Sequence, residues 1–184
     1  MGDGKGNLNL DDVIFPTVPE GVVEDEEVLR LLLGAHAGLL DIYDRLIGEV
    51  DDDRRFLLVL LRSDWRKQCR DVLEPAQTLL DKIQNGKNPD EVGSRPSEED
   101  ATKLVERLKE LDTFSFLAAL EDVATRCAIG LQLVPLGGVS PQVTDLFRRC
   151  VGAEDEHLMQ LAWLRETLSE EQTAWPTKKR RKKK

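Results

Sequence analysis

The sequence predicts an all-α protein, and three observations support this prediction. Apolar residues recur three and four positions apart over long stretches, as they do along one face of a helix. The composition is 40% hydrophobic and 33% charged, with only 5% aromatic residues, and is rich in residues that favour helices. Clusters of Gly, Pro and Asp separate the periodic stretches. A chain of 184 residues is long enough for one domain with a sizeable core.

The first half of the chain predicts an antiparallel pair of helices. Residues 1–24 combine Gly, Asp and Pro with few apolar residues, so we expect an N-terminal arm. A helix is predicted over residues 25–49, where acidic residues at its start suit the helix dipole. The short link at 50–53 offers N-capping aspartates, so a second helix, over 53–83, must turn back on the first. Pro75 lies inside this second helix and is expected to kink or break it.

The second half predicts another helix pair, reached through a long connection. Residues 85–96 form the clearest loop in the chain, and a short amphipathic helix is predicted over 101–111. Two long helices should follow, over 113–134 and from Ser140 to Ser169. Two pairs joined by one crossover that contains a short helix make an antiparallel four-helix bundle. The predicted bundle domain therefore spans residues 25–169.

Residues 170–184 predict a disordered, basic C-terminal tail. The net charge of the chain is −9, and removing the seven positive charges of the tail leaves −16. An acidic body repels phosphate, so any nucleic acid or acidic partner should bind through the tail. In a eukaryotic cell the same residues could act as a nuclear-localisation signal. These residues are Lys178, Lys179, Arg180, Arg181, Lys182, Lys183 and Lys184.

The cysteine pattern predicts a reducing, cytoplasmic environment. Three cysteines, an odd number at irregular spacing, predict buried thiols rather than disulfides or a Cys-x-x-Cys metal site. No stretch resembles a signal peptide or a membrane span, so we expect no membrane contact. The three residues are Cys69, Cys127 and Cys150.

Polar residues interrupt two of the apolar stripes. His36 lies between Leu32 and Leu39 in the first predicted helix. Glu154 and His157, three residues apart, project from one face of the last helix. Glu-x-x-His is the pair with which some helical bundles bind a metal ion from inside. About half the positions of an amphipathic helix lie on or beside its apolar face, so chance also explains such placements.

Over about residues 26–168 the chain resembles the ferritin-like superfamily, in particular small bundles of the rubrerythrin kind. This resemblance implies two iron or manganese ions, bound by a Glu on the first and third helices and by Glu-x-x-His on the second and fourth. Glu121 matches the third-helix ligand, and the fourth-helix pair is present. His36 occupies the first-helix position, however, and the second-helix pair is replaced by Asp-Trp-Arg-Lys at 64–67. The implied metal-ligand candidates are His36, Asp64, Glu121, Glu154 and His157.

Several interpretations of function remain open at this point. In the leading one, the altered site binds at most one Fe, Mn or Zn ion and the protein is a non-catalytic binding or interaction module. The site can equally be a metal-free core in which Lys67 forms an internal ion pair. Alternatives are a non-haem iron or manganese oxidoreductase or metal-storage protein, and a bundle that associates with nucleic acid through its tail. Whether it is an enzyme stays open. A homodimer is compatible with such a fold, although no residue fixes the stoichiometry.

Overall fold

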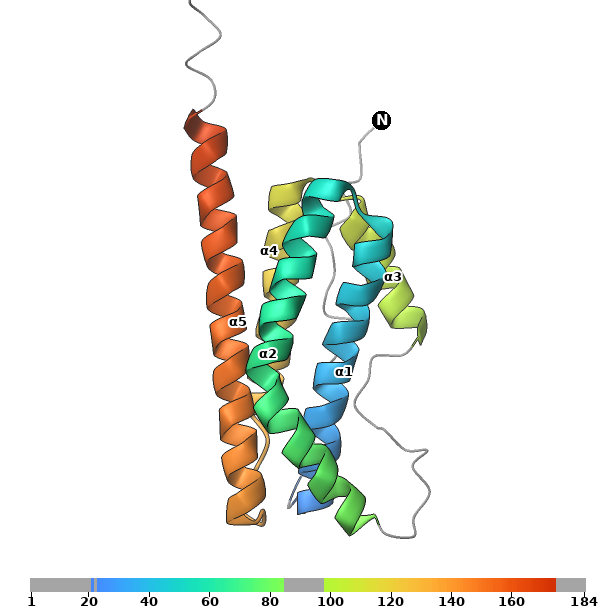
Figure 1. Ribbon diagram of the computed structural model, residues 1–184, viewed down its shortest axis with the longest axis vertical. Helices are drawn as coiled ribbons and strands as arrows, with labels where there is room; N and C mark the ends of the chain where they lie inside the picture. The colour runs from blue at the N-terminus through green and yellow to red at the C-terminus, as the bar shows by residue number, and fades with distance from the viewer. Residues whose placement is uncertain (1–20, 22, 85–97, 175–184) are drawn as a thin grey trace, which may run out of the picture.

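A computed structural model of the protein describes residue 21 and residues 23–84 and 98–174. The described chain is all-helical, as the periodicity predicted (Figure 1). Most of the predicted arm, the loop at 85–96 and the basic residues 178–184 lie outside the described residues. The helices are α1 (Asp25–Glu49), α2 (Asp52–Ile83), α3 (Glu98–Lys109), α4 (Thr113–Gln132) and α5 (Pro141–Ala174).

The four long helices pack side by side, and the short α3 lies against the outside of α1 (Figure 1). A tight turn joins α1 to α2, which run antiparallel. On its other side α2 contacts α5, which in turn packs along α4. No helix in the described part of the chain combines the length and apolarity needed to cross a bilayer.

Side chains cap the starts of three helices, and the caps of the second and last helices were predicted from the sequence. The Asp51 carboxylate accepts a hydrogen bond from the backbone N–H of Arg54 at 3.0 Å, at the start of α2. Asp112 caps α4 by accepting from two backbone N–H groups, each at 3.1 Å. At the start of α5, the Ser140 hydroxyl accepts from the N–H of Val143 at 3.4 Å. These bonds satisfy donors that the first turn of a helix leaves without a partner.

The last helix is longer than predicted, and the second helix is not broken at Pro75. The last helix continues to Ala174 instead of ending near Ser169, because the intervening Glu and Gln residues favour helix. Pro75 does not break α2, which remains one helix. The ribbon of α2 changes direction in its lower half, as expected where proline removes one backbone donor (Figure 1).

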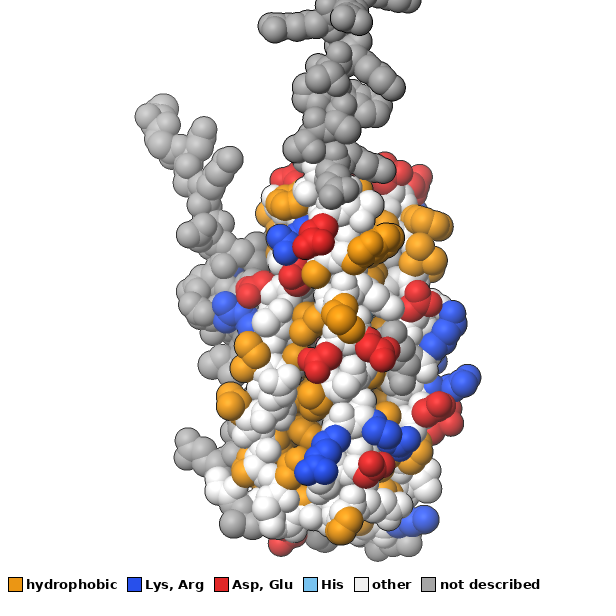
Figure 2. All heavy atoms as spheres, turned by 90° about the vertical axis from the view of Figure 1, so that its left-hand side faces the viewer, with side chains coloured by type: hydrophobic (Ala, Val, Ile, Leu, Met, Phe, Trp, Pro, Cys, Tyr) orange, Lys and Arg blue, Asp and Glu red, His pale blue; other side chains and the backbone are white. Residues whose placement is uncertain are grey.

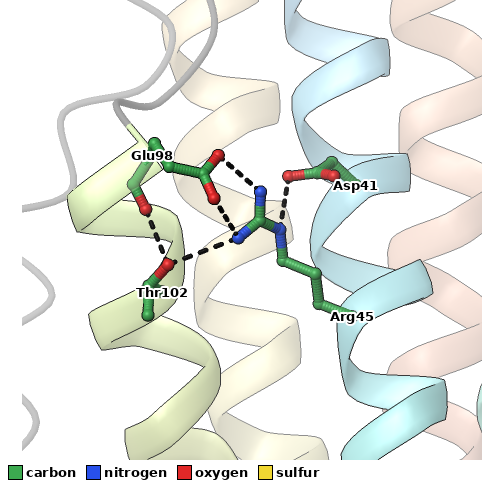
Figure 3. A network of polar contacts seen from close by, with 4 residues as sticks. All are labelled: Asp41, Arg45, Glu98 and Thr102. Atoms are coloured by element: carbon green, nitrogen blue, oxygen red, sulfur yellow. Dashed lines mark hydrogen bonds and ion pairs between the residues drawn. The ribbon is translucent and has the colours of Figure 1, made fainter.

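A polar network attaches α3 to α1 (Figure 3). The Arg45 guanidinium donates to both carboxylate oxygens of Glu98, at 2.8 and 2.6 Å, and to Asp41 at 2.8 Å. It also reaches the hydroxyl of Thr102 at 3.3 Å. The Glu98 carboxylate is largely exposed, so this network sets the position of α3 more than it stabilises the fold.

The core consists of two apolar clusters that follow each other along the bundle. One contains Tyr43, Trp65 and Cys69, and the other contains Cys127 and Cys150. Only three polar or charged residues are buried in the described chain: His36, Glu154 and His157. His36 lies where the two clusters meet, since its neighbours along α1 divide between them. The polar groups that the sequence placed on apolar stripes therefore do lie inside the bundle.

Candidate metal centre

Three potential metal ligands converge inside the bundle. His36 comes from α1, and Cys150 and Glu154 come from α5, where they lie one helical turn apart on the same face. One ligand atom from each residue lies within 4.8 Å of the other two. All three side chains are at most 1% exposed, so the group is closed to solvent. We refer to His36, Cys150 and Glu154 as the buried triad.

The imidazole of His36 is held so that one nitrogen faces the triad. Its Nδ1 lies 3.2 Å from the Leu32 carbonyl oxygen, which can only accept, so Nδ1 carries a proton. Its Nε2 lies 3.0 Å from Oε1 of Glu154 and 3.1 Å from Sγ of Cys69, which comes from α2. The Sγ of Cys150 lies 3.6 Å from Nδ1 and 3.7 Å from Nε2, so it is nearly equidistant from the two nitrogens. A carbonyl on one imidazole nitrogen is a common way to aim the other at a metal ion.

Glu154 is a fully buried carboxylate without hydrogen-bond donors. It is 0% exposed, and neither of its oxygens has a hydrogen-bond partner among the described residues. Its Oε1 lies 3.0 Å from Nε2 of His36, close enough for an ion pair. A buried, ionised carboxylate is strongly unfavourable unless a positive charge compensates it. Either a proton on His36 or a metal ion could supply that charge.

The charge state of the triad depends on its own members. Burial by itself would lower the pKa of His36, but the negative charge and hydrogen bond of Cys150, with help from Cys69 and Glu154, raise it well above 6.5. Burial raises the pKa values of the Cys127 and Cys150 thiols, and the charge of Glu154 adds to both. A metal ion bound here would therefore displace protons from His36 and Cys150.

His157 belongs to an aromatic pocket next to the triad. Its Nε2 lies 2.8 Å from the Tyr43 hydroxyl, and its ring packs against Trp65 with ring centroids 5.3 Å apart. Burial lowers the pKa of His157 from 6.5 to about 4, so the ring is neutral near pH 7. Burial and the charge of Glu154 raise the pKa of Tyr43, so its hydroxyl stays protonated and donates to Nε2. The basic nitrogen of His157 is thus already engaged.

Three of the five predicted ligands lie outside the triad: His157 in the aromatic pocket, and Asp64 and Glu121. Asp64 is exposed and contacts Lys67 at 3.4 Å, and Lys67 is itself 72% exposed. The internal ion pair considered for Lys67 is therefore absent. Glu121 contacts the guanidinium of Arg165 at 2.7 and 3.4 Å, near the surface of the bundle. An arginine thus holds the carboxylate that the resemblance assigned to a metal.

The two thiols next to His36 were not among the ligands predicted from the sequence. Cys69 and Cys150 were expected to be buried free thiols, and the structure confirms this for all three cysteines. Their contact with His36 was not predicted. A signal was present, because Cys150 precedes Glu154 by one helical turn on the same stripe. The contribution of Cys69 depends on how α2 packs against α1.

The donors of the triad suit a single thiophilic metal ion. Thiolate and imidazole ligands favour Zn(II) and related ions, whereas Mn(II) prefers carboxylate and water oxygens. No protein-family profile, curated protein or solved structure matches this chain. The geometry of the buried residues is therefore the main guide to function.

Proposed function

We propose that this protein is a helical bundle that binds one thiophilic divalent metal ion, with Zn(II) favoured, through the buried triad. The observation that carries the proposal is the carboxylate of Glu154, which is completely buried without a hydrogen-bond donor beside an imidazole and a thiol. Cys69 lies 3.1 Å from the same imidazole nitrogen but is not part of the group whose ligand atoms are all within 4.8 Å of one another. The triad would supply one sulfur, one nitrogen and one oxygen, and Cys69 would have to move closer to complete the four-coordinate shell that structural Zn(II) prefers.

The enclosure of the site supports a binding role rather than catalysis. All three triad residues and Cys69 are at most 1% exposed, and apolar clusters lie on both sides. A catalytic metal needs an open position that water or substrate can reach, whereas structural ions have closed shells. We therefore propose a non-catalytic role, in which the ion stabilises the bundle or is itself sequestered or sensed.

We also propose that the helices have a ferritin-like arrangement with an altered site. The order of two long helices, a short one and two more long ones supports it, as does the packing of α5 against both α2 and α4. A two-ion site needs several carboxylates, but Asp64 and Glu121 make ion pairs elsewhere and only Glu154 is buried. One ion with sulfur ligands fits this residue set better than two bridged irons.

A metal-free ion pair is the alternative function of the same residues. The distance of 3.0 Å between His36 and Glu154, together with the raised pKa of His36, favours an imidazolium that compensates the carboxylate. In that case the bundle would be a scaffold or interaction module. The two proposals differ in whether a metal ion displaces the proton that His36 shares with Glu154 in the ion pair.

Metal content and Co(II) spectroscopy test the proposal. We expect the purified full chain to bind one Zn(II) after reconstitution, and Co(II) in its place to give the intense near-ultraviolet absorption of a cobalt–thiolate bond. Cys150→Ser should abolish that absorption, and Glu154→Gln should weaken metal binding. The matched control is Glu166→Gln, which changes an exposed carboxylate on the same helix and should bind like the unmodified protein.

The outcomes separate the two proposals. Loss of the ion from Cys150→Ser and Glu154→Gln, with retention in Glu166→Gln, would establish the triad as the site. A full chain that binds neither Zn(II) nor Co(II) above background would overturn the metal proposal and leave the His36–Glu154 ion pair.

Nucleic-acid binding through residues 178–184 stays a separate prediction, because these residues lie outside the described part of the chain. Binding of a DNA or RNA duplex should weaken steeply with salt and disappear when the seven basic residues are replaced by Ser and Gly. Unchanged binding after this replacement would contradict the prediction.

A further inference from the structure

Large apolar side chains are exposed on the face that α5 and α2 share. Phe56 and Leu60 on α2 are 64% and 46% exposed, and Met159 and Trp163 on α5 are 65% and 63% exposed. Figure 2, which faces the side formed by α5, shows apolar side chains gathered in its upper half. Aromatic residues and Met are enriched at protein interfaces, and contiguous exposed apolar patches commonly mark them. We therefore expect another protein surface to cover this patch.

The contact between Trp65 and His157 shows which residues of α2 and α5 lie at the same height along the bundle. Their rings are 5.3 Å apart, so these positions of α2 and α5 are level. Because α2 and α5 run antiparallel, equal steps away from this contact stay level. Leu60 is then at about the height of Trp163, and Lys67 is at about the height of Glu156. Further along, Asp71 lies about two residues, or roughly 3 Å, from the height of Arg149.

The charges below the apolar patch are opposite on the two helices. Lys67 on α2, which contacts Asp64 of its own helix at 3.4 Å, is about level with acidic Glu156 on α5. Asp71 on α2 lies about two residues from the height of basic Arg149 on α5, which contacts Asp145 at 3.4 Å. The four side chains compared between the two helices are exposed. Along this face α2 presents apolar, basic and acidic groups in turn. At about the same heights α5 presents apolar, acidic and basic groups. The face is therefore complementary to the same face of a second copy.

We propose that a second copy of this chain covers the face, in a two-fold symmetric dimer whose axis runs along the helices. Such an axis places α2 of each copy opposite α5 of the other at unchanged height. Phe56 and Leu60 then pack against the partner's Trp163, and Lys67 pairs with the partner's Glu156. The self-complementary order of charges favours a second copy over an unrelated partner. The dimer is independent of metal binding.

The mass of the full chain in solution is the first test. Light scattering during size-exclusion chromatography should give twice the chain mass of 20.8 kDa. Trp163→Glu should raise the dimer dissociation constant about a thousandfold, because the symmetric interface loses two central aromatic contacts at once. The matched control is Leu133→Glu, which introduces the same charge at an apolar residue 65% exposed outside the face, and should stay dimeric. Far-ultraviolet circular dichroism checks that each variant is folded.

Charge reversal provides a second test that does not disturb the apolar patch. Lys67→Glu and Glu156→Lys should each weaken self-association about tenfold, because each creates two like-charge contacts per dimer. When the two variants are mixed, both contacts become attractive, so a heterodimer should form in preference to either homodimer. Native mass spectrometry of an isotope-labelled mixture measures this preference.

Three results would overturn the proposal. The first is a single 20.8 kDa species at the highest soluble concentration of the full chain. The second is a dimer that Leu133→Glu disrupts as much as Trp163→Glu does. The third is a mixture without heterodimer preference. Either of the last two would place the contact elsewhere.

Discussion

The two histidines of this protein are equally buried but have opposite protonation behaviour. His36 is 1% exposed and His157 is 0% exposed, and each ring packs against Trp65. The pKa of His36 is raised well above 6.5, whereas that of His157 is lowered to about 4. Burial lowers both values, so the neighbouring groups make the difference.

The neighbours of the two rings differ in charge. His36 faces two sulfurs and a carboxylate, which favour its cationic form or a metal ion in the place of its proton. His157 receives a hydrogen bond from the neutral hydroxyl of Tyr43, which favours the uncharged ring. Burial therefore does not identify a metal ligand by itself. The groups that each imidazole nitrogen contacts, and the charges of those groups, distinguish the two histidines.

Replacing Trp65 should have the largest effect, because its indole forms a wall of both histidine sites. It is 0% exposed, stacks on His36 with centroids 4.9 Å apart and also contacts His157. We expect Trp65→Ala to lower the free energy of unfolding by about 3–5 kcal/mol. The pKa of His157 should rise toward 6.5 as water enters, which NMR titration would show. A variant within about 1 kcal/mol of the parent would contradict this packing.

The pH dependence of stability should separate the two histidines in the metal-free protein. His157 binds a proton more readily in the unfolded chain, so stability should fall by about 3 kcal/mol as pH drops from 6.5 to 4. His36 has the opposite sign: its contribution is complete below pH 6.5 and is lost as pH rises through its raised folded pKa. Urea unfolding from pH 4 to well above pH 6.5 measures both contributions. The lowered pKa values of Asp51 and Asp112 place their titration below 3.8.

The matched variant for this prediction is His157→Gln. It should remove most of the loss of stability between pH 6.5 and 4 and leave the behaviour above pH 6.5 unchanged. An unaltered slope in the acidic range would show that His157 is not the group responsible.

The affinity for Zn(II) should also distinguish the two histidines. We expect His36→Gln to weaken Zn(II) binding at least about a hundredfold, because it removes a ligand rather than an outer-shell partner. His157→Gln should change the affinity by less than about tenfold, since its basic nitrogen is occupied by Tyr43. Competition with a chromophoric chelator measures both constants. Equal losses would mean that His157 turns away from Tyr43 to bind the ion.

Removing the hydroxyl of Tyr43 should have the smallest effect. Tyr43→Phe takes away the donor 2.8 Å from Nε2 of His157 and leaves that nitrogen buried without a partner. We expect a loss of about 1–2 kcal/mol in unfolding free energy and no change in Zn(II) affinity. A large fall in Zn(II) affinity would instead connect the aromatic pocket to the triad.

Sequence patterns predicted the helices well and the site only in part. Two features follow from the local sequence alone. The caps at Asp51 and Ser140 follow from residue preferences at helix starts, and the inward placement of Glu154 follows from the helical period of the apolar residues around it. The ligand assignment for Glu121 came from the resemblance to the ferritin-like superfamily. In the structure this residue instead contacts the guanidinium of Arg165 on α5, near the surface of the bundle.

The sequence by itself determined that the protein is helical, where its helices begin, and that His36, Glu154 and His157 point inward. Only the tertiary structure decided which of these groups meet. Cys69 and Cys150 reach His36 from two other helices, while His157 is directed to Tyr43. The physical reason is that helical period fixes the face on which a residue lies. Distances of 3 to 4 Å between helices depend instead on the relative height and rotation set by the packing of the whole core.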